Sequence, residues 1–152
     1  MTGKEYLEEK AKIVEFHTKM VFMPKEQIQD VEITRDMVLN MQLWLDDIRI
    51  YLDDGDEPYL VPMKLERFRS RLLNGWNCLY CTAYDNEYGD CSGCPVAEAG
   101  NHCVNDKDNT YYNNRIAVLN NSIDDIVGLQ KRLVDLAERF VEAHKHLLGD
   151  TV

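Results

Sequence analysis

The chain has 152 residues, with 27 acidic against 17 basic side chains and a net charge of −10. Its length is typical of a single domain with a substantial core, and its small numbers of glycine (8) and proline (4) disfavour both disorder and a turn-rich sheet. The acidity disfavours nonspecific binding to nucleic acid or anionic membranes, and no apolar run approaches the roughly 20 residues of a membrane-spanning helix.

Two amphipathic helices are predicted in the first third of the chain. The first spans 3–22 and ends before Pro24, because proline lacks a backbone donor and clashes with the preceding turn. Its predicted buried face consists of Tyr6, Leu7, Ile13, Val14, Met20 and Val21, and its predicted exposed face of Glu8, Glu9, Lys10, Lys12 and Lys19. The second helix runs to about residue 52, with Thr34 as N-cap and Asp36 in the first turn. Its predicted buried stripe consists of Met37, Val38, Met41, Trp44, Leu45, Ile48, Tyr51 and Leu52.

A short third helix is predicted over about 62–73, after an acidic turn. The turn lacks the ligand spacing and closing glutamate of a calcium loop, so we interpret it as a solvated turn. The predicted buried face of the helix consists of Leu65, Phe68 and Leu72, and its basic patch of Lys64, Arg67, Arg69 and Arg71. We interpret the patch as a solvated face that offsets the acidic bulk. The alternative is a docking site for an acidic partner or a nucleic-acid backbone.

The five cysteines all fall within a single segment, and they are Cys78, Cys81, Cys91, Cys94 and Cys103. The first four form two Cys-x-x-Cys pairs, each of which directs two thiolates at one point. Two such turns supply the four ligands of a tetrahedral zinc ion, and this spacing is typical of a structural zinc site. The sequence therefore predicts a metal-binding loop over 76–105 that holds one structural zinc ion.

The cellular compartment bears on this prediction, because disulfides compete with metal in secreted proteins. Residues 1–9 show neither the basic nor the apolar segment of a secretory leader. We therefore expect a cytoplasmic protein whose thiols stay reduced and free to bind metal.

The ligand set has alternatives. Cys103 can replace Cys91 in the standard double pair, and His102 is interpreted as a solvated loop residue. The thiols can instead hold an iron–sulfur cluster or perform redox chemistry. Residues 76–109 carry six acidic side chains against Lys107 alone, and such a loop repels phosphate. We therefore expect a structural site rather than a nucleic-acid contact.

A long apolar seam predicts a C-terminal helix from about 110 to 148. Its members recur at spacings of three and four, and they are Tyr112, Ile116, Leu119, Ile123, Ile126, Leu129, Leu133, Leu136, Phe140, Ala143 and Leu147. A continuous helix of this length is about 60 Å long, whereas a compact domain of this size has a radius of gyration near 15 Å. Either the helix breaks at Asn120-Asn121 with Ser122 as a new N-cap, or it stays whole and the first two helices lie along it, with or without a second copy of the chain. The unbroken period favours the whole helix, although Gly128 costs about 1 kcal/mol within it.

Chemistry of other kinds has no support in the sequence. There is no Walker loop, no G-x-G-x-x-G, no H-E-x-x-H and no G-x-S-x-G. His144 and His146 are interpreted as helix-end residues, where the dipole favours cations. We therefore predict that the protein is not an enzyme.

Several features of the cysteine segment occur in a fixed order, namely Cys78-x-x-Cys81, Cys91-x-x-Cys94-Pro95-Val96, Gly100-x-x-Cys103 and then Tyr111-Tyr112. This order is similar to a cysteine motif in small proteins of tailed bacteriophages, which are mostly of unassigned function. The similarity covers 35 residues, from Cys78 to Tyr112. It implies a phage-type protein that acts in a bacterial cytoplasm, with metal-binding cysteines and no catalytic residues.

These observations predict an all-α protein with a single domain over 1–152. We expect a helical bundle or hairpin in which a zinc-clasped loop joins three N-terminal helices to one long C-terminal helix. The expected function is a non-enzymatic, zinc-stabilised interaction protein that binds and modulates a host or phage protein. The acidic exterior favours a basic partner, and the long helix offers a surface for a homodimer. The alternatives are an iron–sulfur or redox protein, and nucleic-acid binding through the basic third helix.

Overall fold

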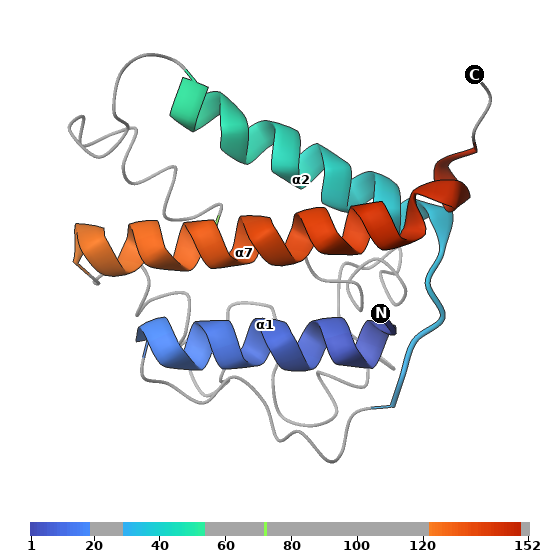
Figure 1. Cartoon of the computed structure of the whole chain (residues 1–152), viewed down its shortest axis with the longest axis horizontal. Helices are drawn as coiled ribbons and strands as arrows, with labels where there is room; N and C mark the ends of the chain where they lie inside the picture. Colours follow the sequence, from blue (N-terminus) through green and yellow to red (C-terminus); the bar gives the residue numbers. More distant parts are fainter. Residues whose placement is uncertain (19–28, 54–71, 73–121, 150–152) are drawn as a thin grey trace, which may run out of the picture.

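The computed structural model describes residues 1–18, 29–53, 72 and 122–149. They form helices α1 (Gly3–Thr18), α2 (Arg35–Asp53) and α7 (Ile123–His144), followed by the 3₁₀ helix η3 (Lys145–Leu148) (Figure 1). No strand occurs within these ranges, so the predicted all-α class is confirmed for this part of the chain. The predicted third helix lies outside the described residues except for Leu72, which is helical and buried as expected.

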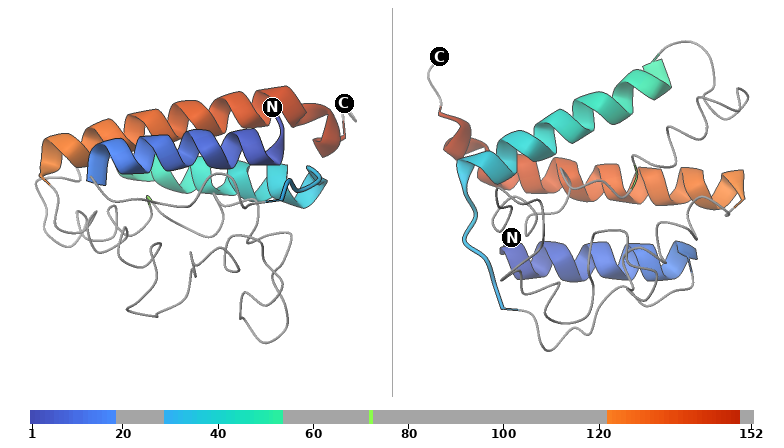
Figure 2. Two further views of the ribbon diagram at one scale, coloured as in Figure 1. Left: turned by 90° about the horizontal axis from the view of Figure 1, so that it is seen from below. Right: turned by 180° about the vertical axis from the view of Figure 1, so that it is seen from behind.

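Helix α7 packs on both α1 and α2, and it runs in the opposite direction to each (Figures 1 and 2). Two contacts define its register against α1. The guanidinium of Arg139 contacts the carboxylate of Glu9, and the guanidinium of Arg132 lies over the ring of Phe16. A step of seven residues forward along α1 therefore matches a step of seven residues back along α7. This confirms that the C-terminal helix packs back on the first two.

The three helices share one core, at whose centre Tyr6, Met41 and Phe140 are each at most 1% exposed. The Tyr6 hydroxyl donates to the sulfur of Met41 at 3.5 Å, and the Tyr6 and Phe140 ring centroids lie 5.3 Å apart in a tilted arrangement. Such tilted aromatic pairs are favourable. The buried positions that the apolar periods predicted are Tyr6, Leu7, Ile13, Val14, Met37, Val38, Met41, Trp44, Leu45, Ile48, Leu72, Ile126, Leu129, Leu133, Leu136 and Phe140.

The prediction that Lys10 lies on the exposed face of the first helix is wrong, because Lys10 is fully buried. Lys10 follows Tyr6 by four residues and precedes Val14 by four, so it lies within the buried arc of α1. Gln130 on α7 is buried in the same way, at 4% exposed.

Of the two alternatives for the C-terminal seam, the structure confirms the break with Ser122 as N-cap and not the helix continuous through Ser122 that the apolar period favoured, because α7 begins at Ile123. Ser122 has an extended backbone (φ −63°, ψ 158°), which a continuous helix does not allow. The backbone N–H of Asp125 donates to the Ser122 hydroxyl at 3.3 Å, and the hydroxyl donates to the Asp125 carboxylate at 2.8 Å. This reciprocal pair satisfies a helix donor that otherwise has no partner. At 22 residues, α7 is about 33 Å long.

The other end of α7 also differs from the predicted seam. Ala143 is exposed, so the buried stripe ends at Phe140, and the helix ends at His144. The seam from Ile126 to Phe140 is covered by α1 and α2 of the same chain. It is therefore internal in the single chain.

The start of α1 is attached to the segment that precedes α2. The carboxylate of Asp30 accepts from the backbone N–H of Lys4 and from that of Val31, each at 2.8 Å. Gly3 permits this close approach, since a Cβ there would lie 2.5 Å from a methyl carbon of Val31 and 2.9 Å from its carbonyl oxygen. On α2, the Thr34 hydroxyl accepts from the N–H of Met37 at 3.4 Å, as predicted for the N-cap.

A second glycine brings α1 and α7 together near the end of α1. A Cβ on Gly128 would lie only 2.7 Å from Cε1 of His17, a ring that is 9% exposed. The glycine that weakens α7 as an isolated helix therefore makes room for a side chain of α1.

None of the helices in the described ranges is long and apolar enough to cross a membrane.

Candidate functional site

An open groove runs between the solvent-facing sides of α1 and α7. Its volume is about 510 Å³, and it is lined by Glu9, Lys12, Ile13, Lys131, Arg132, Asp135 and Arg139. The lining positions on each helix recur at spacings of one, three or four residues, so they share one helix face. The antiparallel register brings the two faces opposite one another.

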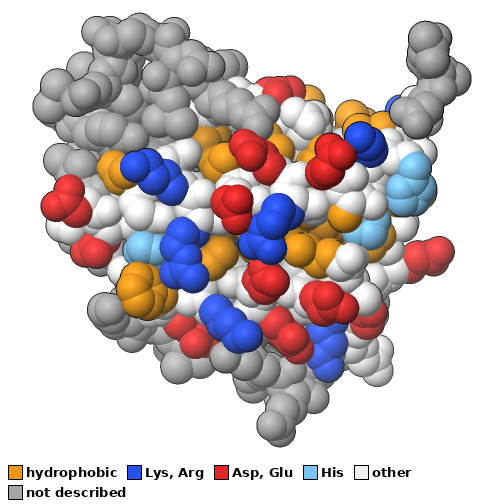
Figure 3. Space-filling view, in the orientation of Figure 1, with side chains coloured by type: hydrophobic (Ala, Val, Ile, Leu, Met, Phe, Trp, Pro, Cys, Tyr) orange, Lys and Arg blue, Asp and Glu red, His pale blue; other side chains and the backbone are white. Residues whose placement is uncertain are grey.

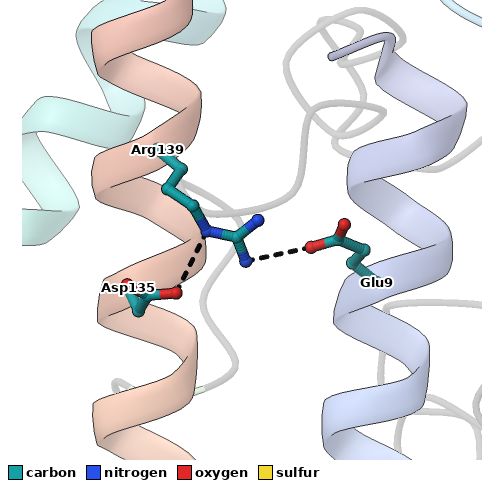
Figure 4. Close-up of polar contacts among 3 residues, drawn as sticks. All are labelled: Glu9, Asp135 and Arg139. Carbon is teal, nitrogen blue, oxygen red and sulfur yellow. Dashed lines mark hydrogen bonds and ion pairs between the residues drawn. The ribbon is translucent and has the colours of Figure 1, made fainter.

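Arg139 joins the two walls of the groove (Figure 4). Its Nη2 donates to the carboxylate of Glu9 on α1 at 3.0 Å, and its Nε donates to that of Asp135 on its own helix at 3.0 Å. Desolvation by burial lowers the pKa of Arg139, but the hydrogen bonds and charges of the two carboxylates outweigh it and raise the pKa above its ordinary value. All three side chains are 43–68% exposed. Each ion pair therefore contributes only about 0.2–1 kcal/mol to stability.

At one end of the groove, the lining residue Arg132 contacts the ring of Phe16 on α1, one turn beyond Lys12. The guanidinium carbon of Arg132 lies 5.2 Å from the centroid of the Phe16 ring, a distance at which the face of the ring attracts a cation. Phe16 remains 61% exposed, the largest exposure among the large hydrophobic side chains in the described ranges. A partner can therefore contact both the ring and the cation.

Two further cations, Lys12 on α1 and Lys131 on α7, are exposed and make no ion pair with any described residue. Four cations thus line the groove together with two carboxylates, which leaves a local excess of two positive charges on a chain of net charge −10. Figure 3 shows lysine and arginine side chains interleaved with acidic ones over α1 and α7 on this face. The groove is suited to a negatively charged ligand.

The lining excludes a typical small-molecule pocket. Such pockets have volumes of about 300–1,000 Å³, which includes this one, but they are lined mainly by apolar side chains. Here Ile13 is the only apolar lining residue among those described. The groove therefore offers ionic contacts on an open surface rather than an apolar enclosure.

The five predicted metal ligands Cys78, Cys81, Cys91, Cys94 and Cys103 lie outside the described residues, as does His102. The zinc-clasped loop stays a prediction. Within the described ranges, no group of three or more histidine, cysteine or acidic side chains is arranged to hold a metal ion. The basic patch of the predicted third helix also lies outside these ranges.

His144 and His146 lie at the end of α7 and in η3, as expected of helix-end residues. His144 donates from Nε2 to the backbone carbonyl of Met1 at 2.8 Å, so its role in the fold is to hold the start of the chain. The ring centroids of the two histidines lie 6.2 Å apart.

Sequence reasoning did not find the groove. The exposed positions Lys12 and Phe16 lie one turn apart, as do Lys131 and Asp135, and this spacing was visible in the sequence. What was missing is the register of α1 against α7, which depends on close contacts such as that of His17 with Gly128.

No protein-family model matches the chain, and neither the curated proteins nor the solved structures compared with it give a match.

Proposed function

We propose that this chain is a non-enzymatic, zinc-stabilised helical protein that binds a partner protein through the groove between α1 and α7. The observation that carries the binding role is the combination of exposed Phe16 with two exposed lysines that make no ion pair with a described residue. Phenylalanine and arginine, here the contacting pair Phe16 and Arg132, are enriched at the core of protein interfaces relative to the rest of the surface.

The zinc part of the proposal is supported by the cysteine spacing. The thiolates of Cys78, Cys81, Cys91 and Cys94 are the favoured ligands, with Cys103 as the replacement for Cys91. When bound, zinc supplies structural cross-linking rather than catalysis. The similarity to phage proteins supports a bacterial cytoplasm as the place of action and a host or phage protein as the partner.

The charge of the chain constrains this partner. A net charge of −10 favours a partner that is basic overall, because long-range repulsion slows the approach of an acidic protein. The groove adds a local cationic contact. A basic surface that carries a short acidic segment satisfies both conditions.

Zinc content is tested by elemental analysis of the purified protein, with about one zinc ion per chain expected. The two tryptophans allow the metal segment and the core to be followed separately by fluorescence, because Trp44 is fully buried in α2 whereas Trp76 adjoins the cysteines. A chelator should change the fluorescence of the wild-type protein but not that of Trp76→Phe. Protein free of zinc, or absorbance typical of an iron–sulfur cluster, contradicts the zinc proposal.

The binding role is tested by placing a photo-reactive phenylalanine analogue at position 16 and, as a matched control, at position 39 on α2. Leu39 is also an exposed apolar residue, at 36%, but it lies outside the groove. In bacterial cytoplasmic extract we expect a discrete adduct from position 16 only. No adduct from position 16, or the same adducts from both, contradicts binding through this groove. The mass of the free protein in solution shows whether the partner is a second copy.

A further inference from the structure

The cations of the groove differ in how far they are already neutralised. Arg139 is paired with Glu9 and Asp135, each at 3.0 Å. Lys12 and Lys131 have no such partner among the described residues, and they stand on opposite walls. A ligand that crosses from one wall to the other can therefore gain two new ion pairs without breaking an existing one.

We propose that the groove binds a short, extended acidic segment of the partner protein. Two carboxylates of the segment pair with Lys12 and Lys131, and an adjacent aromatic or large apolar side chain packs on Phe16. This inference rests on the proposed function, because it names the chemistry of the partner at the same groove.

The dimensions of the groove fix the length of the segment. On α1 the lining residues run from Glu9 to Ile13, and Phe16, which contacts the lining residue Arg132, lies three residues further on. The stretch from Glu9 to Phe16 therefore covers seven residue steps, or about 10 Å at 1.5 Å per step. An extended peptide advances about 3.3 Å per residue. Three or four residues therefore span the groove, which is enough for two carboxylates and one apolar side chain.

The net charge of the chain does not prevent this contact. At physiological ionic strength the Debye length is about 8 Å, so acidic side chains on other faces are largely screened. Lys12 and Lys131 act at direct contact with the ligand, where screening is weakest. The local excess of positive charge in the groove therefore favours a negatively charged ligand.

A peptide fits the groove better than a nucleic acid. Each strand of duplex DNA carries one phosphate per about 3.4 Å, so a strand at this spacing would place about three phosphates along the groove, close to the carboxylates of Glu9 and Asp135. A nucleic acid has no neutral residue to place there. A peptide can put an uncharged residue opposite these carboxylates and its acidic residues opposite the lysines.

The test uses the full-length protein and fluorescence anisotropy with labelled pentapeptides. The probe has four glutamates around a central phenylalanine, and the comparison peptides replace the glutamates with glutamines or lysines. We expect the glutamate peptide to bind most tightly and its affinity to fall with added salt. Neutralising either lysine, by Lys12→Gln or Lys131→Gln, should weaken binding about two- to fivefold.

A matched control separates the groove from the charge of the whole chain. Lys12→Glu, Lys131→Glu and Arg35→Glu each change the net charge equally, and Arg35 is an exposed residue of α2 outside the groove. We expect Lys12→Glu and Lys131→Glu each to weaken binding, and Arg35→Glu, which changes the net charge by the same amount as either of them, to bind like the wild type. The combined Lys12→Glu, Lys131→Glu variant should lose at least about tenfold in affinity. Phe16→Ala should weaken the phenylalanine peptide but not one with a central glycine.

Several outcomes would overturn the inference. They are equal loss of affinity in Arg35→Glu, unchanged affinity in the double lysine variant, and tighter binding of a single-stranded oligonucleotide than of the glutamate peptide. Tighter peptide binding after neutralisation of the acidic run 53–57 would assign the groove to that stretch of the same chain and also overturn it. Zinc content and cross-linking from position 16 are measured separately, so failure of the acidic-segment inference is distinguishable from failure of the proposed function.

Discussion

The contact between Gly128 and His17 makes a sharp prediction about the packing of α1 on α7. In an exposed helix interior, replacing glycine with alanine stabilises by about 1 kcal/mol. Here the added Cβ would lie 2.7 Å from Cε1 of His17, closer than real Cβ contacts allow. Because the His17 ring is only 9% exposed, it has little room to move away.

The magnitude follows from these two opposing effects. Overpacking a well-packed site costs about 1–3 kcal/mol, and the gain in helix propensity offsets about 1 kcal/mol of it. Gly128→Ala should therefore leave the free energy of unfolding unchanged or lower it by up to about 2 kcal/mol. In a His17→Ala background the clash is absent, and the same substitution should raise the free energy of unfolding by about 1 kcal/mol.

The assay is urea unfolding of the wild type, the two single variants and the double variant, followed by circular dichroism. The coupling energy between the two sites should be about 1–3 kcal/mol. His17→Ala has its own cost, which cancels in the double-mutant cycle. If Gly128→Ala stabilises both backgrounds equally, the two residues are not in contact, and the register of α1 against α7 is refuted.

Three other predictions test the core and the helix ends by the same unfolding measurement. Tyr6→Ala should cost about 3–5 kcal/mol because the ring is fully buried. Tyr6→Phe should cost about 1 kcal/mol or less, since the bond that it removes within the described residues is the weak one to Met41; equal costs would contradict the central position of the ring. Gly3→Ala should destabilise more than Gly128→Ala, because its added Cβ meets the backbone carbonyl of Val31 as well as a side chain; a stabilised Gly3→Ala variant would mean that the preceding segment does not dock there. Ser122→Ala should cost about 1 kcal/mol and Ser122→Gly only a few tenths, and no loss from Ser122→Ala would argue against a helix start at this residue.

The sequence predicted the helices best where two local signals agreed. At the start of α2, the Thr34 cap and the apolar stripe from Met37 pointed to one boundary, and the structure confirms it. At the start of α7 the signals conflicted, since the apolar period continued upstream while Ser122 and Asp125 formed a capping pair. The capping signal gave the correct boundary. The backbone of Ser122 is extended, so α7 begins after Ser122 even though apolar side chains continue at helical spacing before it.

The failures of prediction arose from tertiary contacts. Lys10 was assigned to the surface because of its charge, although its position lies within the arc that α1 buries. The groove was missed for a related reason. Its ion pair of Glu9 with Arg139 joins residues 130 positions apart in the chain. No local pattern specifies which turn of α7 faces which turn of α1, and that choice depends on the packing of rings and glycines.

The position of the core within the chain also indicates what the proposed zinc ion can contribute. Helices α2 and α7 pack together although residues 54–122 separate them. If zinc binding halved the effective length of this connection, the entropy cost of bringing α2 and α7 together would fall by only about 0.6 kcal/mol. Zinc binding to a structural thiolate site, by contrast, is worth about 10–16 kcal/mol. A zinc ion in the cysteine segment therefore stabilises chiefly the segment that binds it. The core around Tyr6, Met41 and Phe140, with Trp44 buried in the same helix as Met41, includes many apolar side chains from α1, α2 and α7, and for this reason we expect the Trp44 signal to survive chelation.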